Sequence, residues 1–418
     1  MNIADYVKDK AVKSREAARI FGRLLPGIKN ELLLRIADSL EASVDTLKQE
    51  NSKDLDLGRE KGLSEALIDR LTLTDKRIAE MAQGMREISV LPDPVGEITG
   101  MWQRPNGIRV GRMRVPIGVI GIIYESRPNV TADASALCLK AGNAVILRGG
   151  SEALHSNTAI ANVLRDVLNK MSLPQDVISY IDNPNREAVL EMLKLEECID
   201  LIIPRGGESL IRAVVDNSKI PVIKHYKGVC HVYVDEDADL DMAISICFNA
   251  KVQRPGVCNA METMLVHEKA APMFLPRIGE KFKQAGVELF GCKQTRDLIP
   301  EAGLVQDDDF YKEYLDLRLN IKVVKNMDMA IDHIETYGSH HTESIVTRDY
   351  AKAMRFLREV DSSSVMVNAS TRFSDGFQYG LGAEIGISTD KIHARGPMGI
   401  EELTCTKFIV LGDGHVRI

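Results

Sequence analysis

The stretch QRPGVCNAMET, residues 253–263, contains a cysteine that could act as a nucleophile. Its Pro-Gly pair cannot continue a helix or a central strand, so Cys258 is predicted to lie on a bend. If a helix begins after that bend, its first N–H groups and positive dipole end favour a thiolate and could bind an oxyanion. The alternative is a buried cysteine without a chemical role. Cys138, Cys198 and Cys247 lie in apolar periodic runs and fit that alternative, whereas Cys258 has a polar setting.

A second candidate is Asn129 in YESRPNVTADA, residues 124–134, where a predicted strand ends at a proline turn and a helix begins. Asparagine is a good helix N-cap, and on spacing alone this structural role is favoured. The functional alternative is that the side-chain amide donates a hydrogen bond to a developing oxyanion.

Two strand-Gly-Gly-helix junctions, ILRGGSEALHSN and IIPRGGESLI, could bind a nucleotide. Each places glycines and a hydroxyl at a predicted helix N-terminus, where phosphates bind readily. Neither matches GxGxxG, so the usual dinucleotide fingerprint is missing. GLGAEIG contains GxG but no helix is predicted after it, and we treat it as a false match to that fingerprint.

Polar residues also gather near predicted strand ends in YGSHHTESIVT and NASTRFSDGFQYG. A solvated loop would explain them. The functional hypothesis is that they bind an anionic substrate, through His340, His341, Ser370, Thr371 and Arg372.

The elements that must position these residues follow from hydrophobic periodicity. Residues 1 to about 92 are predicted to be helical, because apolar residues such as Leu33, Ile36 and Leu40 recur at a spacing of 3.6. After the proline and glycine residues of LPDPVGEITG, the segment GMWQRPNGIRVGRMRVPIG is predicted to form a β-hairpin or meander.

From residue 119 onward, strand-like and helical runs alternate, which is typical of a parallel sheet covered by helices. The predicted strands of a first series are VIGIIYE, NAVILRGG, VISYID, IDLIIPRGG and IPVIKHY, with helices at NVTADASALCLKAG and SNTAIANVLRDVLNK. A second series contains ETMLVHE, IKVVKNM, ESIVTR and SVMVNAS. The sequence therefore predicts two α/β domains with a boundary near residues 235–239.

Composition narrows the functional class. A chain of 418 residues with 44% hydrophobic and 27% charged residues suggests two or three globular domains. The net charge of −7 without a basic block argues against nucleic acid or an anionic membrane as partner. No signal-like leader and no apolar run of ~20 residues is present, which favours the cytoplasm. Seven scattered cysteines without a CxxC pair indicate reduced thiols and no metal site.

Several of these stretches resemble the aldehyde dehydrogenase superfamily, and within it the branch that reduces L-glutamyl 5-phosphate. They are ESRPNVTADASALCLKAGNAVILRGGSEA, HYKGVCH, AKVQRPGVCNAMET, YGSHHTESIVT and GLGAEIGISTDKIHARGPMG, in this order over essentially the whole chain. The resemblance implies an α/β fold with a nucleotide-binding and a catalytic parallel-sheet domain, plus a small β oligomerisation element. The implied bounds are 1–96 and 117–236 for the nucleotide-binding domain, 237–370 for the catalytic domain, 97–116 and 400–418 for the oligomerisation strands, and 371–399 for a segment returning to the nucleotide-binding domain.

The resemblance also assigns residue roles. Cys258 matches the superfamily's catalytic thiol, and Asn129 matches the asparagine that shares the oxyanion hole with the nucleophile's backbone N–H. Glu384 in GLGAEIG resembles the glutamate that holds the nicotinamide ribose. The implied adenosine and pyrophosphate contacts are Arg148, Ser151, Glu152, Gly206, Gly207 and Ser209. NADPH as cofactor follows from the resemblance alone, since no residue demonstrates a site for a 2′-phosphate.

The implied reaction is the NADPH-dependent reduction of L-glutamyl 5-phosphate to glutamate 5-semialdehyde and phosphate in proline biosynthesis, through a thioester on Cys258. Hydrolytic aldehyde dehydrogenases carry a glutamate that activates water, and the corresponding stretch here, HYKGVCH, has no carboxylate. This absence favours the reductase. The alternatives are a hydrolytic aldehyde dehydrogenase for another small aldehyde, a catalytically silent relative, and a cysteine hydrolase. A homodimer or homotetramer is expected, and docking with a glutamate kinase stays an open question.

Overall fold

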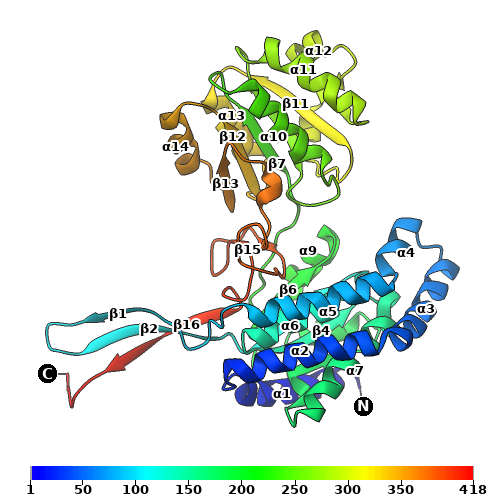
Figure 1. Ribbon diagram of the computed structural model, residues 1–418, viewed down its shortest axis with the longest axis vertical. Helices are drawn as coiled ribbons and strands as arrows, with labels where there is room; N and C mark the ends of the chain where they lie inside the picture. The colour runs from blue at the N-terminus through cyan, green and yellow to red at the C-terminus, as the bar shows by residue number, and fades with distance from the viewer. Residues whose placement is uncertain (1, 418) are drawn as a thin grey trace. The chain divides into compact units, whose positions relative to one another are not determined.

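A computed structural model describes residues 2–417, which divide into two compact units (Figure 1). Unit 1 comprises the described residues up to Lys224, Gly380–Gly386 and those from Met398 onward. Unit 2 comprises His225–Tyr379 and Ile387–Pro397. Residues 1 and 418, at the ends of two predicted segments, lie outside the described residues. Within the described part, no helix has both the length and the apolar character that a membrane span requires.

The predicted helical start of the chain is confirmed. The apolar residues recur so that one face of each helix is buried. In α2, for example, Leu33, Ile36 and Leu40 are fully buried. Ser64 and Thr74 accept hydrogen bonds from backbone N–H groups at two of the helix starts. The bounds are α1 (Ile3–Phe21), α2 (Pro26–Ala42), α3 (Val44–Glu60), α4 (Glu65–Leu71) and α5 (Asp75–Val90).

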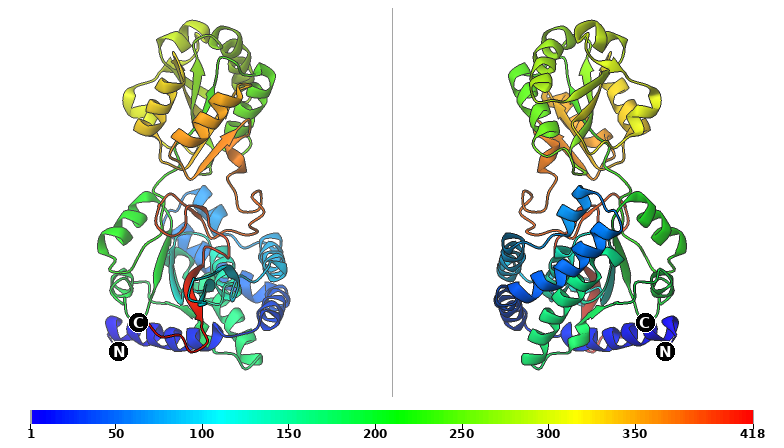
Figure 2. Two further views of the ribbon diagram at one scale, coloured as in Figure 1. Left: turned by 90° about the vertical axis from the view of Figure 1, so that its left-hand side faces the viewer. Right: turned by 90° about the vertical axis from the view of Figure 1, so that its right-hand side faces the viewer.

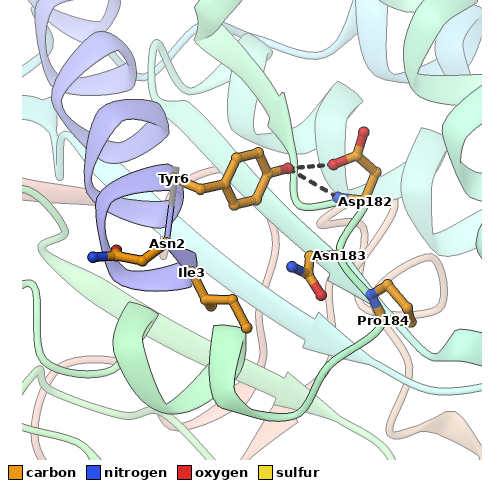
Figure 3. Close-up of a pocket in the computed structure, with 6 residues that line it drawn as sticks. All are labelled: Asn2, Ile3, Tyr6, Asp182, Asn183 and Pro184. Atoms are coloured by element: carbon orange, nitrogen blue, oxygen red, sulfur yellow. Dashed lines mark hydrogen bonds between the residues drawn. The ribbon is translucent and has the colours of Figure 1, made fainter.

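The first helix is anchored to the end of a strand of unit 1. The hydroxyl of Tyr6 donates to the carboxylate of Asp182 and accepts from the Asp182 backbone N–H at 3.3 Å, beside a small hollow (Figure 3). Burial and the neighbouring carboxylate raise the pKa of Tyr6 above its usual value, so the phenol stays a donor. We assign this hollow a structural role, because its polar groups serve to hold α1.

The sheet of unit 1 has the order β5-β4-β3-β6, and all its strands are parallel. The strands are β3 (Val119–Tyr124), β4 (Ala144–Gly149), β5 (Ile178–Tyr180) and β6 (Leu201–Arg205), alternating with α6 (Asn129–Lys140), α7 (Leu154–Lys170), α8 (Glu187–Met192) and α9 (Glu208–Asn217). The strands are buried on both sides, and α2 and α5 pack outside α6 (Figure 1). Four predicted strands are confirmed. The fifth, IPVIKHY, is wrong, because only an isolated bridge between Ile202 and Val222 forms there.

A second, antiparallel sheet of unit 1 joins distant parts of the chain. The predicted hairpin is confirmed as β1 (Ile98–Gln103) and β2 (Arg109–Pro116), and β16 (Thr404–Leu411) pairs with β2 (Figure 1). Several large apolar side chains of this sheet are exposed, among them Met101, Trp102, Phe408 and Val410.

The sheet of unit 2 has the order β10-β9-β11-β8-β7-β12-β13 and is also parallel (Figure 2). Along β7, Val232 and Val234 pack in one core and Tyr233 in another, as alternation across a strand requires. The strands are β7 (Cys230–Val234), β8 (Met261–His267), β9 (Glu288–Gly291), β10 (Gly303–Leu304), β11 (Arg318–Val324), β12 (Thr342–Val346) and β13 (Ser364–Val367); the helices are α10 (Leu240–Val252), α11 (Ala271–Gln284), α12 (Lys293–Leu298), α13 (Met327–Tyr337) and α14 (Tyr350–Glu359).

The four strands predicted for the second series correspond to β8, β11, β12 and β13. The structure differs from the predicted bounds at the transition between the units. The predicted bounds place β7 before the boundary at 236, but β7 hydrogen-bonds to β8 and β12 and belongs to unit 2. The predicted return segment 371–399 is likewise divided, since only Gly380–Gly386 and its last two residues belong to unit 1.

A buried ion pair fixes the end of α10 against the start of β8. Lys251 Nζ lies 2.7 Å from Glu262 Oε2, and both side chains are fully buried. Glu262 Oε1 also accepts from the backbone N–H of Leu315 at 3.2 Å. Burial raises the pKa of Glu262 to about 7 and lowers the pKa of Lys251, so each charge depends on its partner.

We therefore expect Glu262→Gln to destabilise the protein by about 3–5 kcal/mol, because it leaves the Lys251 charge buried without a counterion. The double variant Lys251→Met/Glu262→Leu should recover most of that loss. Urea unfolding followed by far-ultraviolet circular dichroism measures both. The control is Lys269→Met, which breaks the exposed pair with Glu236 and should hardly move the midpoint. A double variant as unstable as Glu262→Gln would contradict the expectation.

Candidate active site

Cys258 lies in a turn between α10 and β8, with a partly exposed side chain. The predicted bend at Pro255 and Gly256 is therefore present. The helix considered after this bend does not form, because the chain enters β8 at Met261. Met264 and other alternating residues of this segment fill the core of unit 2, and that burial favours a strand over a helix. A helix dipole consequently plays no part at this thiol.

The backbone of Cys258 is in close contact with Gly228, just before β7. A Cβ atom placed on Gly228 would lie 1.9 Å from the carbonyl oxygen of Cys258 and 2.7 Å from its Cα. Only glycine allows this approach. Two residues later, the Cys230 thiol donates to the same carbonyl oxygen at 3.1 Å. Burial raises the pKa of Cys230, which keeps it a neutral donor.

Two imidazoles lie beside the Cys258 thiol. Donor atoms of Cys258, His225 and His341 all lie within 4.8 Å of one another, and the two rings meet edge to face at 5.7 Å. His225 and Cys258 lie in the segments that lead into β7 and β8, and His341 directly precedes β12. Since β8, β7 and β12 are neighbours in one parallel sheet, the sheet brings the three residues together at its amino edge.

Two guanidinium groups add positive charge near the thiol. Arg372 donates from Nε to Gln253 at 2.8 Å and also donates to Asn259, so it is anchored to both sides of the Cys258 turn. Burial and the charge of Arg254 lower the pKa of Arg372, while Cys258 is among the groups that interact with it electrostatically. Positive charge of this kind favours anionic ligands.

The other predicted substrate residues have structural contacts. His340 adopts a positive φ of 58° and its Nδ1 lies 2.6 Å from the carbonyl oxygen of Asp361. The Ser370 hydroxyl accepts from the Arg372 backbone N–H at 3.3 Å, and the Thr371 side chain is buried. Of the predicted set, the structure therefore brings His341 and Arg372 to the thiol.

Asn129 is the first residue of α6 in unit 1, and the N-cap position is taken by Pro128. The N-cap interpretation of Asn129 is therefore wrong. Its side-chain Nδ2 donates to Asp133 Oδ2 at 2.9 Å, one turn along the helix. Burial raises the pKa of Asp133 to about 6. The oxyanion role of Asn129 stays a prediction.

The residues predicted to bind the cofactor lie mostly at the carboxyl edge of the unit 1 sheet, at or just beyond the ends of β4 and β6. Glu125, after β3, accepts from the Gly207 backbone N–H at 3.0 Å, and Glu152 accepts from the backbone N–H and hydroxyl of Ser126 at 2.7 and 2.8 Å. These bonds connect the loops of three neighbouring strands. Ser151 and Ser209 are exposed there.

Arg148 and the segment of Glu384 belong to the same unit. The guanidinium of Arg148 donates to the carbonyl groups of Gly149 and Pro184, at 2.7 and 2.9 Å. A Cβ on Gly386 would lie 2.7 Å from the guanidinium of Arg205, so Gly386 lies close to the residue that ends β6. The segment Gly380–Gly386 belongs to unit 1.

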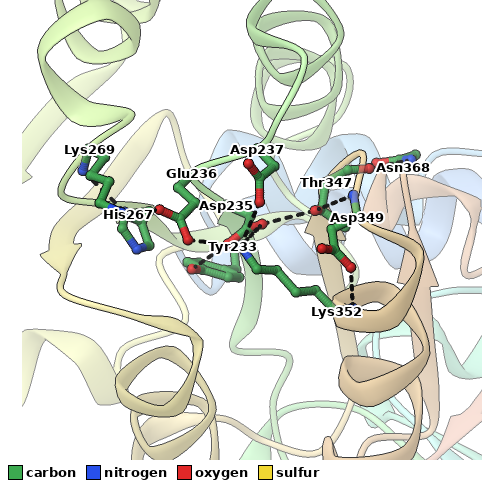
Figure 4. Close-up of polar contacts among 10 residues, drawn as sticks. All are labelled: Tyr233, Asp235, Glu236, Asp237, His267, Lys269, Thr347, Asp349, Lys352 and Asn368. Carbon is green, nitrogen blue, oxygen red and sulfur yellow. Dashed lines mark hydrogen bonds and ion pairs between the residues drawn. The ribbon is translucent and has the colours of Figure 1, made fainter.

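The opposite edge of the unit 2 sheet holds a charged network. Lys352 lies 3.1, 2.9 and 2.7 Å from carboxylates of Asp235, Glu236 and Asp237, and Thr347 donates to Asp235 at 2.9 Å (Figure 4). The three carboxylates follow the carboxyl end of β7, whereas Cys258 is at the amino end of β8. Each carboxylate lies within ion-pair distance of Lys352, and Glu236 also pairs with Lys269, so we assign the network to stability.

Sequence reasoning missed His225, Gly228, Cys230 and Arg254. The first three lie in HYKGVCH, in which the resemblance draws attention only to the lack of a carboxylate. A signal existed in the sequence, because HYKGVCH places a histidine and a cysteine, two residue types that can do chemistry, five positions apart on either side of a glycine. Cys138 and Cys247 are fully buried, as predicted, whereas Cys198 is partly exposed and differs from the prediction. The seven cysteines all lie within the described residues and are free.

Comparisons with known proteins identify the family of the chain. Residues 4–293 match the model of the aldehyde dehydrogenase family. The chain is 62% identical over 417 residues to the gamma-glutamyl phosphate reductase of Thermodesulfovibrio yellowstonii, and 60% identical over 417 residues to that of Geobacter metallireducens, covering 100% of both chains in each case. The crystal structure of gamma-glutamyl phosphate reductase from Thermotoga maritima superposes with a TM-score of 0.97 at 49% identity, covering 99% of this chain and 100% of that one.

The chain therefore belongs to the aldehyde dehydrogenase family and is an oxidoreductase. Within that family it belongs with the gamma-glutamyl phosphate reductases. The resemblance drawn from the sequence and the predicted fold class are confirmed.

The contact between Gly228 and Cys258 leads to a prediction. Gly228→Ala should lower turnover by about 10²-fold, because the methyl group must displace the Cys258 backbone and a shift of ~1 Å has that effect. The matched control is Gly256→Ala in the same turn, where the new Cβ has only an ordinary contact of 3.6 Å with the Leu315 carbonyl oxygen. Turnover and thermal unfolding are measured for both. Normal turnover of a folded Gly228→Ala protein would contradict the proposed importance of this contact.

Proposed function

We propose that the protein reduces L-glutamyl 5-phosphate to L-glutamate 5-semialdehyde with NADPH, through a thioester on Cys258, in proline biosynthesis. The observation that carries the proposal is the 62% identity to a gamma-glutamyl phosphate reductase over the whole of both chains. The setting of Cys258 agrees with it, since a partly exposed thiol between imidazoles and guanidinium groups is suited to attack a phosphorylated carboxylate.

The carboxyl edge of the unit 1 sheet fits a nucleotide. Gly207 caps α9, so its N-terminal N–H groups can face a pyrophosphate. The buried Nε of Arg148 has no hydrogen-bond partner within residues 2–417, which suits a ligand acceptor. The residues that would hold the cofactor are Arg148, Ser151, Glu152, Gly206, Gly207, Ser209 and Glu384. When bound, NADPH supplies the hydride.

In the proposed reaction, the Cys258 thiolate attacks the acyl carbon, and the bond to phosphate breaks to leave a thioester. His225 or His341 takes the thiol proton, because these imidazoles are the nearest bases that the structure places beside the sulfur. After reduction, the tetrahedral oxyanion collapses, the aldehyde leaves, and the thiolate returns. Asn129 Nδ2 and the Cys258 N–H donate to that oxyanion.

Arg372 and Arg254 are the proposed ligands of the leaving phosphate. The two guanidinium groups repel each other near Cys258. A dianion that binds between them relieves this repulsion. The remaining predicted substrate residues have structural roles in this proposal: the Ser370 hydroxyl accepts from the Arg372 backbone N–H, the Thr371 side chain is buried, and His340 is held by the Asp361 carbonyl group. The exposed apolar side chains of the antiparallel sheet are the proposed oligomerisation surface, in a dimer or tetramer.

The reverse reaction tests the function against a hydrolytic aldehyde dehydrogenase. With glutamate 5-semialdehyde and NADP, we expect a burst of about one NADPH per active site that stalls until inorganic phosphate is added, since phosphate is the acceptor of the thioester. NADPH absorbance is followed with and without phosphate, and Cys258→Ala, which should show no burst, is the control. Steady turnover to glutamate in phosphate-free buffer would favour the hydrolytic alternative.

The oxyanion role of Asn129 has its own test. Asn129→Ala should lower kcat by about 10²–10³-fold with little change in NADPH affinity, because one oxyanion donor is lost. Asp133→Ala is the matched control: it removes the hydrogen-bond partner of the amide but keeps the amide, so it should lower kcat far less. The role is refuted if Asn129→Ala lowers the melting temperature and leaves kcat of the folded protein normal.

A further inference from the structure

We propose that Cys258, His225 and His341 form a binding site for a zinc-class divalent cation, and that occupation of this site switches the nucleophile off. The binding itself is independent of the proposed function, whereas its inhibitory consequence rests on Cys258 being the nucleophile of that function. The cation is a reversible ligand of the resting protein and takes no part in the reaction.

The three side chains have nearly the spacing that a zinc ion requires. A tetrahedral zinc ion holds sulfur at ~2.3 Å and imidazole nitrogen at ~2.0–2.1 Å, which places the ligand atoms ~3.3–3.6 Å apart. The three donor atoms here lie within 4.8 Å of one another. Side-chain movements of about 1 Å therefore complete the site. Cys258 and His225 are partly exposed, so a cation can reach them.

The surrounding groups hold the ligands in place. His341 Nδ1 lies 2.8 Å from the Thr342 hydroxyl and 3.7 Å from Cys230 Sγ, which fixes the orientation of this buried ring. Gly228 and Cys230 fix the Cys258 backbone, as described above. Outer contacts of this type raise metal affinity because they lower the entropy lost when the ligands are ordered.

The ligand set selects the class of cation. One thiolate with two imidazoles suits Zn²⁺ and is a poor match for Mg²⁺ or Ca²⁺, which prefer oxygen ligands. Three protein ligands leave a fourth position open for water. A thiolate bound to zinc shares its electron pair with the metal, so it loses its reactivity toward an acyl carbon. The neighbouring Arg372 and Arg254 oppose the cation electrostatically, which keeps binding reversible.

Cobalt provides the test, because Co²⁺ takes the place of zinc and a cobalt–thiolate bond absorbs in the near ultraviolet. Reduced, chelator-treated protein is titrated with Co²⁺ without substrate. We expect one Co²⁺ per chain with a charge-transfer band that Zn²⁺ displaces. Cys258→Ser should remove the band, and His225→Ala should weaken binding by at least ~10-fold. The controls Cys405→Ser, an exposed thiol, and His155→Ala should leave the titration unchanged.

A second measurement connects binding to activity. Micromolar Zn²⁺ should inhibit wild-type turnover, a chelator should restore it, and Mg²⁺ should have no effect. The proposal is overturned if the band persists in Cys258→Ser, if His225→Ala binds Co²⁺ as tightly as wild type, or if no band forms. Because the cobalt titration needs neither NADPH nor an acyl phosphate, its failure leaves the proposed reductase activity untouched, and a failure of that activity leaves the binding result standing.

Discussion

The site of unit 2 depends on one close contact, in which the backbone of Gly228 lies directly against that of Cys258. The two residues belong to the segments that enter β7 and β8, and the parallel register of these strands sets how closely the segments approach. The buried pair of Lys251 and Glu262 holds the other side of the turn by joining the end of α10 to β8. A turn that could otherwise move is thus fixed on both flanks, which is what a reacting atom requires.

The two units use opposite edges of their sheets. In unit 1 the predicted cofactor residues follow the carboxyl ends of β4 and β6, the usual place for a ligand in an open α/β sheet. In unit 2 the thiol and its imidazoles lie at the amino ends of β7, β8 and β12, and the carboxyl end of β7 is occupied by the ion pairs of Lys352. The rule that ligands bind at the carboxyl ends of parallel strands therefore predicts the position of the unit 1 residues but not that of Cys258.

Much of the fold could be predicted from the sequence, because helical and strand periods differ and buried strands need apolar runs. The features that the sequence did not predict depend on contacts between distant parts of the chain. IPVIKHY has the composition of a strand but only one bridge forms there, since pairing depends on a neighbour that composition does not reveal. The bend at Cys258 follows from Pro255 and Gly256, whereas the strand after it is decided by the core that Met264 enters. His225 and His341 are far apart in sequence, and only the strand order β7-β12 brings them together.

His225 offers a base beside Cys258 even though the glutamate of hydrolytic aldehyde dehydrogenases is missing. HYKGVCH lacks a carboxylate, but an imidazole beside the thiol is itself a base that can activate water. The choice between water and phosphate must then depend on what occupies the space next to the thioester. Arg372 and Arg254 concentrate anions there, and an imidazole that keeps the proton it took from the thiol cannot take another from water. In the proposed reductase, selectivity against hydrolysis would come from positive charge near Cys258 more than from the absence of a base.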